Sequence, residues 1–405
     1  MRILMFHTND ASFNALNIFY EKLSDEFKKK GHDTYFINLM DDNSISDLYQ
    51  HLSSRNYDIV FSINSIGEGG IRLPNGNNIY DNFNIPFLEM LLDHPMDHIK
   101  YILNSGNNFH LTYCDRDHRS FIEKYCPHVK SCHFVENLGG LVPDSDSAFT
   151  YEDFLNRPFN AVLIGNHMDL AEGNDYLMSL PQNMRIIAGD MIDYMLENRD
   201  IPTDIAMRKI LDEHGLHGLD GEDFAKTCGI FSRVSYYVRS YVREEIFRYI
   251  AESGISFDVF GGGWDKIKDE PLNNIRIHSG IPYPRTAGIY KNAKIGINIS
   301  PWFKNGTHDR FPTVLMNGAV MLTDHSKLLD ERYLDMPENE RIMAFYDINK
   351  PQDVPEIIIK LISDTARLYD MAERGRAYAN INLTWEKAAE RVLDIMQSIL
   401  SSNIS

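Results

Sequence analysis

The sequence is poor in cysteine and has no long apolar run. Its 405 residues include four cysteines, none in a CxxC pair, and no nearby histidine spacing is typical of a zinc site. Buried free thiols in a reducing compartment are therefore expected. The apolar start that ends at His7 is too short for a signal peptide, and no run approaches membrane-spanning length. We expect a soluble, cytoplasmic protein with no membrane span.

Positive charge is also scarce, because 40 Lys and Arg stand against 58 Asp and Glu, a net charge of -18. Such a surface repels phosphate backbones, and no local basic run offsets it, so no nucleic-acid partner is expected. Neither half opens with a strand–GxGxxG–helix unit, which disfavours a dehydrogenase. Internal repeats and low-complexity segments are absent as well.

What the sequence does contain is a regular alternation of short apolar runs and amphipathic stretches. This alternation predicts parallel sheets with right-handed crossovers, the pattern of Rossmann-like α/β domains. The predicted strands of the first half are Ile3–His7, Thr34–Leu39, Asp58–Asn64, Phe87–Leu92, His110–Tyr113 and Ser131–Val135. Those of the second half are Ala161–Ile164, Phe257–Phe260, Ile275–His278, Lys294–Ile299, Ala319–Thr323 and Ile342–Tyr346.

A change of composition divides the two halves. The stretch Gly139–Pro158 holds paired glycines, two prolines and an acid-and-serine run, which is typical of a linker. We therefore predict an N-terminal Rossmann-like domain over 1–145 and a linker over 146–159. A C-terminal Rossmann-like domain follows over 160–385, with a helical elaboration at 169–254, and a closing helix occupies 386–405. With two facing domains of this kind, ligands are expected in the interdomain cleft, at the carboxyl ends of the strands.

Two glycine-containing loops follow predicted strands of the second half. Gly262 and Gly263 come directly after Phe257–Phe260, where glycines let the backbone approach an anion. A tight turn with Trp264 as a packing anchor explains them equally well. After the strand Lys294–Ile299, a loop leads into a helix that must begin near Asp309 or Arg310, because Pro312 is tolerated only in a first turn.

That helix start could hold a diphosphate. Its candidate residues are Asn305, Gly306, Thr307 and Arg310. An ordinary capped helix, with Asp309 as the cap, is the simpler explanation. Near the strand end at His278, Ile281 and Tyr283 could flank a flat base, although a plain turn also accounts for them.

In the first half, His94 and Glu68 follow predicted strands. Histidine titrates near neutrality and can take a proton from an acceptor hydroxyl, and Glu68 could act as a base in a glycine-rich loop. Inert residues remain the simpler explanation for both. Arg239 and Arg243 lie one turn apart on a predicted helix beside two glutamates, which favours a solvated face over a phosphate contact.

The order of landmarks from Phe257 to about Arg391 resembles the C-terminal domain of the spore-maturation CgeB-like glycosyltransferases, members of the GT-B class. The landmarks are Val259–Trp264, Gly280, Tyr283, Tyr290–Ile299, Arg310–Phe311, Asn317–Asp324, Tyr346–Asp347, Arg374–Arg376 and Thr384–Trp385. Ala161–Asn166 is similar to the strand that opens this domain in the group. The first half fits only in outline.

The resemblance implies a metal-independent glycosyltransferase of hexosyltransferase type, with no cofactor and a nucleotide-sugar donor, a UDP-sugar above all. The base would lie near Ile281–Tyr283, and the diphosphate near Gly262–Gly263 and Asn305–Arg310. His94, with Glu68 second, would be the catalytic residue in the acceptor domain, acting on a hydroxyl of a glycan or protein. Where many relatives place a ribose-binding carboxylate, this chain has Thr313.

That departure keeps two alternatives open. One is a catalytically silent protein of the same fold that binds a sugar nucleotide or has a structural role. The other is a GT-B-fold nucleotide-sugar epimerase, which would consume donor without an acceptor.

Overall fold

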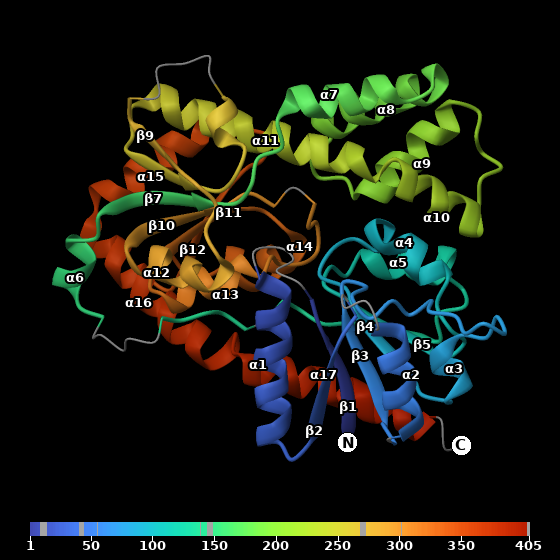
Figure 1. Ribbon diagram of the computed structural model, residues 1–405. Helices are drawn as coiled ribbons and strands as arrows, with labels where there is room; N and C mark the ends of the chain where they lie inside the picture. The colour runs from blue at the N-terminus through green and yellow to red at the C-terminus, as the bar shows by residue number, and fades with distance from the viewer. Residues whose placement is uncertain are drawn as a thin grey trace. The chain divides into compact units, whose positions relative to one another are not determined.

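The structure is a computed structural model, and it describes residues 1–8, 14–39, 44–54, 56–137, 139–143, 149–267, 273–300 and 302–402 (Figure 1). The chain forms two compact units. The first unit comprises Met1–Leu138, Gly218–Ile230 and Trp385–Ser405, and the second comprises Gly139–His217 and Phe231–Thr384. Each unit contains a six-stranded parallel sheet with flanking helices.

The sheet of the first unit has the strand order β2-β1-β3-β4-β5-β6. Its strands are β1 (Arg2–His7), β2 (Asp33–Asn38), β3 (Ile59–Ile63), β4 (Phe87–Met90), β5 (Phe109–Tyr113) and β6 (Ser131–Phe134). Its helices are α1 (Ala15–Lys29), α2 (Ser44–Ser54), α3 (Ile79–Asn82), α4 (Ile99–Leu103), α5 (His118–Tyr125), α10 (Gly221–Ile230) and α17 (Trp385–Ser402), with a 3₁₀ turn at Pro95–His98.

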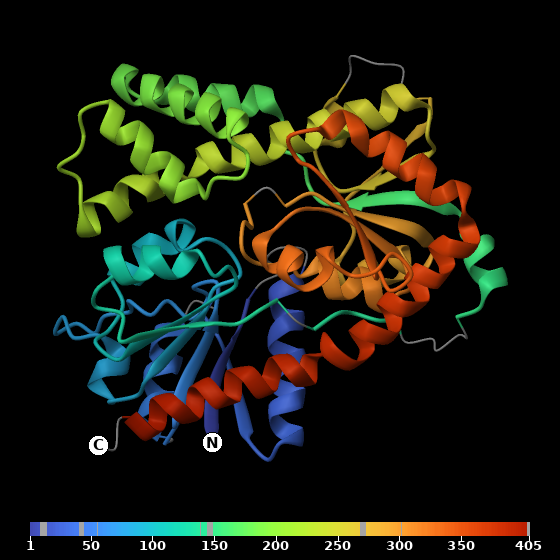
Figure 2. The ribbon, with the colours of Figure 1, turned by 180° about the vertical axis from the view of Figure 1, so that it is seen from behind.

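The first sheet is buried on both faces. Four consecutive residues of β1, Ile3–Phe6, have no exposed surface, which is typical of a central parallel strand covered on both sides. On α1, the buried residues fall three or four positions apart and form one apolar stripe. Phe19 of this stripe meets Trp385 of α17 edge to face at 5.0 Å. Figures 1 and 2 agree that α17, in red, crosses one face of this sheet.

The sheet of the second unit has the order β12-β11-β10-β7-β8-β9. Its strands are β7 (Phe159–Ile164), β8 (Phe257–Phe260), β9 (Ile275–His278), β10 (Ala293–Asn298), β11 (Val320–Asp324) and β12 (Met343–Tyr346). Helices α6 (Tyr151–Leu155), α12 (Thr286–Lys291), α13 (Arg310–Met316), α14 (Lys327–Leu329), α15 (Val354–Ser363) and α16 (Thr365–Asn382) belong to it, with short turns at Trp264–Lys266, Tyr283–Arg285, Asp330–Leu334 and Pro351–Asp353.

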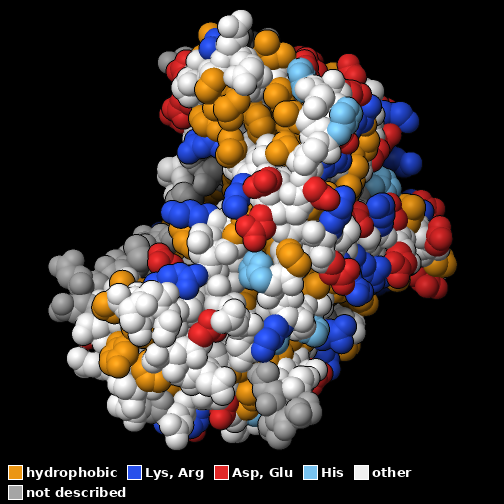
Figure 3. Space-filling model, turned by 90° about the vertical axis from the view of Figure 1, so that its right-hand side faces the viewer, with side chains coloured by type: hydrophobic (Ala, Val, Ile, Leu, Met, Phe, Trp, Pro, Cys, Tyr) orange, Lys and Arg blue, Asp and Glu red, His pale blue; other side chains and the backbone are white. Residues whose placement is uncertain are grey.

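Helices α7 (Leu170–Ser179), α8 (Gln182–Glu197), α9 (Thr203–Glu213) and α11 (Ser232–Ser253) form the helical elaboration of the second unit. Hydrophobic side chains gather near the top of the face drawn in Figure 3, in the region of α7 to α9. Met178 of α7, Ile186 of α8 and Ile205 of α9 are each more than half exposed. No helix in the described part of the chain combines the length and hydropathy that crossing a bilayer requires.

All twelve predicted strands are present, and the predicted GT-B fold class is confirmed. The units nevertheless divide the chain differently from the predicted domains. Residues 218–230, expected in the C-terminal domain, belong to the first unit, because α10 packs on α4 and α5 through Phe224 and Gly229. The predicted linker contains α6, which is capped by Thr150 and buries Phe154 completely. Residues 144–148 of the predicted boundary lie outside the described residues.

Candidate functional site

The strand order of the second sheet marks one place for a ligand. From β7 the chain continues outward through β8 and β9 on one side, while β10, β11 and β12 extend on the other. The direction of strand order therefore reverses between β7 and β10. In open α/β sheets, ligands bind beyond the carboxyl ends of the strands at such a switch point. Ile164 ends β7 and Asn298 ends β10, so the residues that follow them are the candidates for ligand contact.

Three arginines converge at this edge. Arg310 begins α13 and donates from Nη1 to the side-chain oxygen of Asn298 at 2.5 Å. Arg243 of α11 donates from Nη1 to the carbonyl of Asn166 at 2.7 Å. A β-carbon built on Gly165 would lie 3.4 Å from Nη2 of Arg310 and 3.9 Å from Cζ of Arg243. Both guanidinium groups therefore lie against the turn that follows β7.

The third arginine, Arg239, stands one helical turn before Arg243. The ring of Trp302 joins the two, since its centroid lies 4.3 Å from Cζ of Arg239 and 4.9 Å from Cζ of Arg243. Cation–π contacts of this kind hold guanidinium groups at a fixed position without neutralising their charge. Arg239 is 8% exposed, so the predicted solvated face was wrong for this residue: the aromatic ring covers it.

The charges of the cluster act against one another. Burial, together with the charges of Arg310 and Arg239, lowers the pKa of Arg243 to about 9. The neighbouring glutamates serve other partners, because Glu244 pairs with His167 and Arg248, and Glu245 with Arg199. Since arginine stays protonated at neutral pH, the lowered pKa reflects an environment that favours an anion. The cluster of Arg239, Arg243 and Arg310 (the arginine cluster) suits a diphosphate.

The glycines after β8 serve the packing of two turns. Gly263 has φ of 88°, and a β-carbon there would lie 2.0 Å from the carbonyl oxygen of His167. The Gly262 N–H donates to the side chain of Asn166 at 2.9 Å, and its carbonyl accepts the N–H of His167 at 2.9 Å. Trp264 is fully buried and donates to the carbonyl of Gly165 at 2.7 Å. The geometry favours the tight-turn explanation over direct contact with an anion.

The predicted loop residues Asn305, Gly306 and Thr307 lie between β10 and α13. The Gly306 carbonyl accepts the Ser326 hydroxyl at 2.8 Å, and Thr307 is 2% exposed, so this loop is tied to the segment after β11. Arg310 reaches the switch point through Asn298, and Gly306 and Thr307 line a small pocket together with Asn298, Ser300 and Asp324. Nearby, burial raises the pKa of Asp324 to about 6, and its carboxyl accepts the Ser300 N–H at 3.0 Å.

Thr313 and Tyr283 form a separate group, in which Thr313 is buried and Tyr283 is partly exposed with a buried hydroxyl. Thr313 is 2% exposed, and its hydroxyl accepts the N–H of Leu141 at 3.2 Å. The Tyr283 hydroxyl lies against Thr313 and Asp309, and burial and then the Asp309 charge raise its pKa well above the usual range. Ile281 is partly exposed in the preceding turn. The structure therefore brings Tyr283 and Thr313 together but shows the Thr313 hydroxyl already engaged by the backbone.

In the first unit, the two predicted catalytic residues differ in exposure. His94 caps the 3₁₀ turn Pro95–His98: its Nδ1 accepts the N–H of Met96 at 3.1 Å, which leaves the ring hydrogen on Nε2. It is 5% exposed, and its ring lies edge-on to His118 at 4.4 Å. Glu68 is exposed, on a turn after β3 with φ of 40°.

Sequence reasoning missed a buried carboxyl in the first unit. Glu89 on β4 is 1% exposed and accepts the N–H of Ser65 at 2.8 Å, and burial raises its pKa to about 8. The sequence feature that could have predicted this buried carboxyl is a glutamate within the apolar stretch Pro86–Leu92. Across the described residues, no group of three or more His, Cys, Asp or Glu side chains is arranged to hold a metal ion.

Residues 239–394 match the family described as glycosyl transferase-like, a region that contains all three residues of the arginine cluster and covers less than half of the chain. A search of curated protein sequences finds no match.

Solved structures resemble the chain over nearly its whole length. Sucrose-phosphate synthase from Thermosynechococcus elongatus is 9% identical with a TM-score of 0.55, covering 99% of this chain and 100% of its own. HepE from Anabaena, in complex with UDP and glucose, is 10% identical with a TM-score of 0.53, covering 98% and 100%. An α-glucosyltransferase, in complex with UDP-glucose and DNA containing an abasic site, is 11% identical with a TM-score of 0.54, covering 98% and 99%. At these identities the likeness establishes the fold.

Proposed function

We propose that this protein is a glycosyltransferase that moves a hexose from a nucleotide-diphosphate donor, a UDP-sugar above all, to a hydroxyl acceptor on a glycan or protein. The observation that carries the proposal is the arginine cluster. Its three guanidinium groups stand at the switch point of the second sheet, within the region that matches the glycosyl transferase-like family. Of the three structural neighbours described above, two are complexes with UDP or UDP-glucose.

In this proposal the arginines act on the leaving group. When the bond between the sugar and the diphosphate breaks, negative charge accumulates on the departing phosphate oxygens. Preorganised guanidinium groups stabilise that charge without reorganising at the moment of reaction. Arg243 and Arg310, held by Asn166 and Asn298, are positioned in this way. Stabilisation by the chain's own cations is the basis on which we propose a metal-independent reaction with no cofactor.

The catalytic role in the first unit is assigned to His94, with Glu68 second. Because Nδ1 accepts the Met96 N–H, the ring hydrogen of His94 is on Nε2, which favours the role of a sugar-orienting donor over that of a base. The test is the turnover of His94→Ala, accompanied by His94→Asn, which can still cap the turn. Normal turnover in a correctly folded His94→Ala variant would refute this role.

One observation favours a second candidate, a silent protein that binds a sugar nucleotide. Thr313 stands where a ribose-binding carboxylate is expected, and its hydroxyl is engaged by Leu141. Such a protein would bind nucleotide but release no sugar to any acceptor.

The test is thermal unfolding against UDP, ADP, GDP and their sugar conjugates, followed by donor hydrolysis and transfer assays. A ligand that binds only the folded state contributes about 2.7 kcal/mol of stabilisation at a hundredfold excess over its dissociation constant. A shift with one nucleotide diphosphate, followed by transfer, is the expected result. A shift without transfer would support the silent protein, and no shift with a well-folded sample would contradict the donor site.

A further inference from the structure

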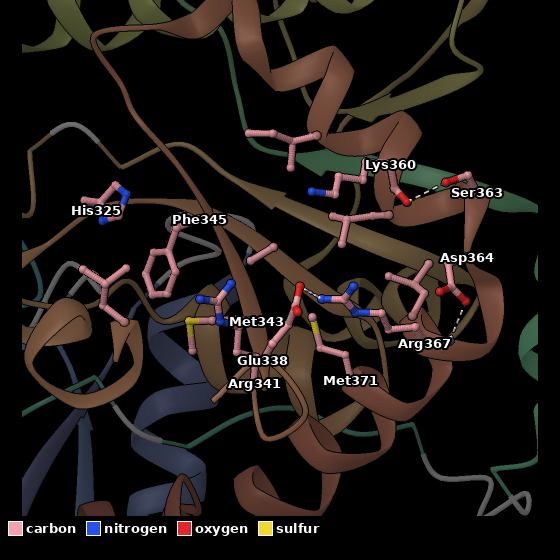
Figure 4. A pocket seen from close by; sticks show the side chains of 15 residues that line it. His325, Glu338, Arg341, Met343, Phe345, Lys360, Ser363, Asp364, Arg367 and Met371 are labelled. Carbon is pink, nitrogen blue, oxygen red and sulfur yellow. Dashed lines mark hydrogen bonds and ion pairs between the residues drawn. The ribbon is translucent and has the colours of Figure 1, made fainter. Parts of the chain in front are cut away.

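A cavity lies in the second unit, and no residue of the arginine cluster lines it. It measures about 540 Å³ and lies beside β12, the edge strand of the sheet. Its walls come from β12, from α15 and the start of α16, and from the segment that joins η5 (Asp330–Leu334) to β12 (Figure 4). Its volume falls in the range of small-molecule sites.

The floor of this cavity is apolar. Met343, Phe345, Leu368 and Met371 line it, together with aliphatic side chains of α15. Met343, Leu368 and Met371 are buried in the unit, so the floor belongs to the packed core. Phe345 stacks on His325, with ring centroids 5.0 Å apart and an angle of 17° between the rings. Phe345 and Leu334, which also lines the cavity, remain partly exposed above this packed floor and offer an apolar surface to the nonpolar part of a ligand.

The rim of the cavity carries three cations and two carboxylates, so positive charge is in excess. The cations are Arg341, Lys360 and Arg367, and the carboxylates are Glu338 and Asp364. Glu338 pairs with Arg367, and Asp364 accepts the backbone N–H of Arg367 as the cap of α16. Neither carboxylate is bonded to Lys360 or Arg341. Within the described residues, the Lys360 ammonium has no hydrogen bond or ion pair, and Arg341 contributes one long contact, from Nε to the Met336 carbonyl at 3.4 Å.

The electrostatics agree with this geometry. Glu338 lies within the field of all three cations, because Arg367 first, and then Arg341 and Lys360, lower the pKa of its carboxyl. Figure 4 shows the charged ends of Lys360, Arg341 and Arg367 directed toward the space above Met343 and Phe345. The surplus positive charge of the rim is opposite in sign to the net charge of the chain, which is -18. Its complement is a molecule with an anionic head and an apolar body.

We propose that this cavity binds a soluble amphipathic anion, whose carboxylate or phosphate head lies between Lys360 and Arg341 and whose apolar body covers Phe345 and Leu334. The site does not rest on the proposed function, since it shares no residue with the arginine cluster. The anionic head would pair with the two cations, Lys360 and Arg341, and the apolar body would contact the apolar lining of the cavity.

The probes are octyl phosphate and octanoate, with inorganic phosphate and octan-1-ol as controls, measured by calorimetry on the full chain. Both amphipathic anions should bind saturably. Inorganic phosphate lacks the alkyl chain and octan-1-ol lacks the anionic group, so each control should bind at least about tenfold more weakly. Equal binding of octan-1-ol and octyl phosphate would overturn the proposal, because the cations would then have no role.

The variants locate the binding. Lys360→Met and Arg341→Gln should each weaken octyl phosphate about tenfold or more, with unchanged circular dichroism and unligated thermal midpoint. Lys209→Met, which removes an exposed lysine from α9, should have no effect. Arg243→Gln should also leave the affinity unchanged. Loss of binding in Arg243→Gln with retention in Lys360→Met would place the probe at the arginine cluster and refute the site. Binding confined to phosphatidylglycerol vesicles, with none to soluble octyl phosphate, would also contradict it.

Discussion

Arg243 and Arg310 bring their guanidinium groups to the same residue, Gly165, from two different helices of the second unit. Each is held there by an oxygen acceptor, the Asn166 carbonyl for Arg243 and the Asn298 side chain for Arg310. Two like charges kept this close oppose each other until an anion enters. In the proposed function, a bound diphosphate would relieve this repulsion.

The first prediction concerns these two arginines. Arg243→Gln and Arg310→Gln should each weaken binding of a nucleotide diphosphate by about 10- to 100-fold, because each removes a charge-assisted contact. Stability without ligand should be unchanged or higher, since repulsion within the cluster is relieved. Calorimetry with UDP and thermal unfolding check the two parts. Arg248→Gln is the control, because Arg248 pairs with Glu244 on the same helix. An equal loss of affinity in the control would contradict the assignment.

The second prediction separates the two neighbouring glycines. Gly263→Ala should lower the free energy of unfolding by about 2 kcal/mol or more, because its φ is 88° and the new β-carbon would collide with the His167 carbonyl. Gly262→Ala should fold normally, because the nearest atom to its β-carbon is Oδ1 of Asn166 at 3.8 Å. Urea unfolding of the pair provides the measurement. If Gly262→Ala folded normally but lost nucleotide binding, the loop would contact the ligand after all.

The third prediction concerns Thr313. Thr313→Val should cost about 1–3 kcal/mol of stability, because the Leu141 N–H loses its acceptor in a buried place. Thr313→Ser keeps the hydroxyl and should be milder. Nucleotide affinity, measured on folded protein, should be the same for both variants. A tenfold weaker affinity in Thr313→Val, with stability unchanged, would instead show that this hydroxyl binds the ribose.

The fourth prediction is a pH dependence that originates at Glu89. Burial raises its folded pKa to about 8, above the value in the unfolded chain, so the folded state binds more protons between the two values. Its contribution to stability is complete below the unfolded pKa and is lost as the pH rises through about 8. Glu89→Gln keeps a neutral side chain at every pH, so its stability relative to the original chain should increase from pH 5 to pH 8.5. The upper bound is on the order of 5 kcal/mol.

Denaturant unfolding at several pH values measures this difference. Glu68→Gln is the control, because Glu68 is exposed and should give no such trend. A stability difference for Glu89→Gln that stays constant with pH would refute the prediction.

The sequence alone determined the strands, their parallel alternation with helices and the long last helix. These features follow from local periodicity: a strand buried on both faces is a short apolar run, as in Ile3–Phe6, and an amphipathic helix shows its stripe, as in α1. The candidate residues at strand ends followed from the same local signals, since loops at carboxyl ends carry the polar groups. For Gly262 and Gly263 the sequence left two explanations equally open.

Only the tertiary structure decided which residues meet. Arg239 and Arg243 share a helix with two glutamates, and nothing local shows that Trp302 covers them and that Arg310 joins them. The partner of Thr313 is the backbone of Leu141, from a distant part of the chain. Lys360 and Arg341 likewise border one cavity only after β12, α15 and α16 have packed. Contacts between residues far apart in sequence leave no period in the sequence, because they depend on how whole elements pack against each other.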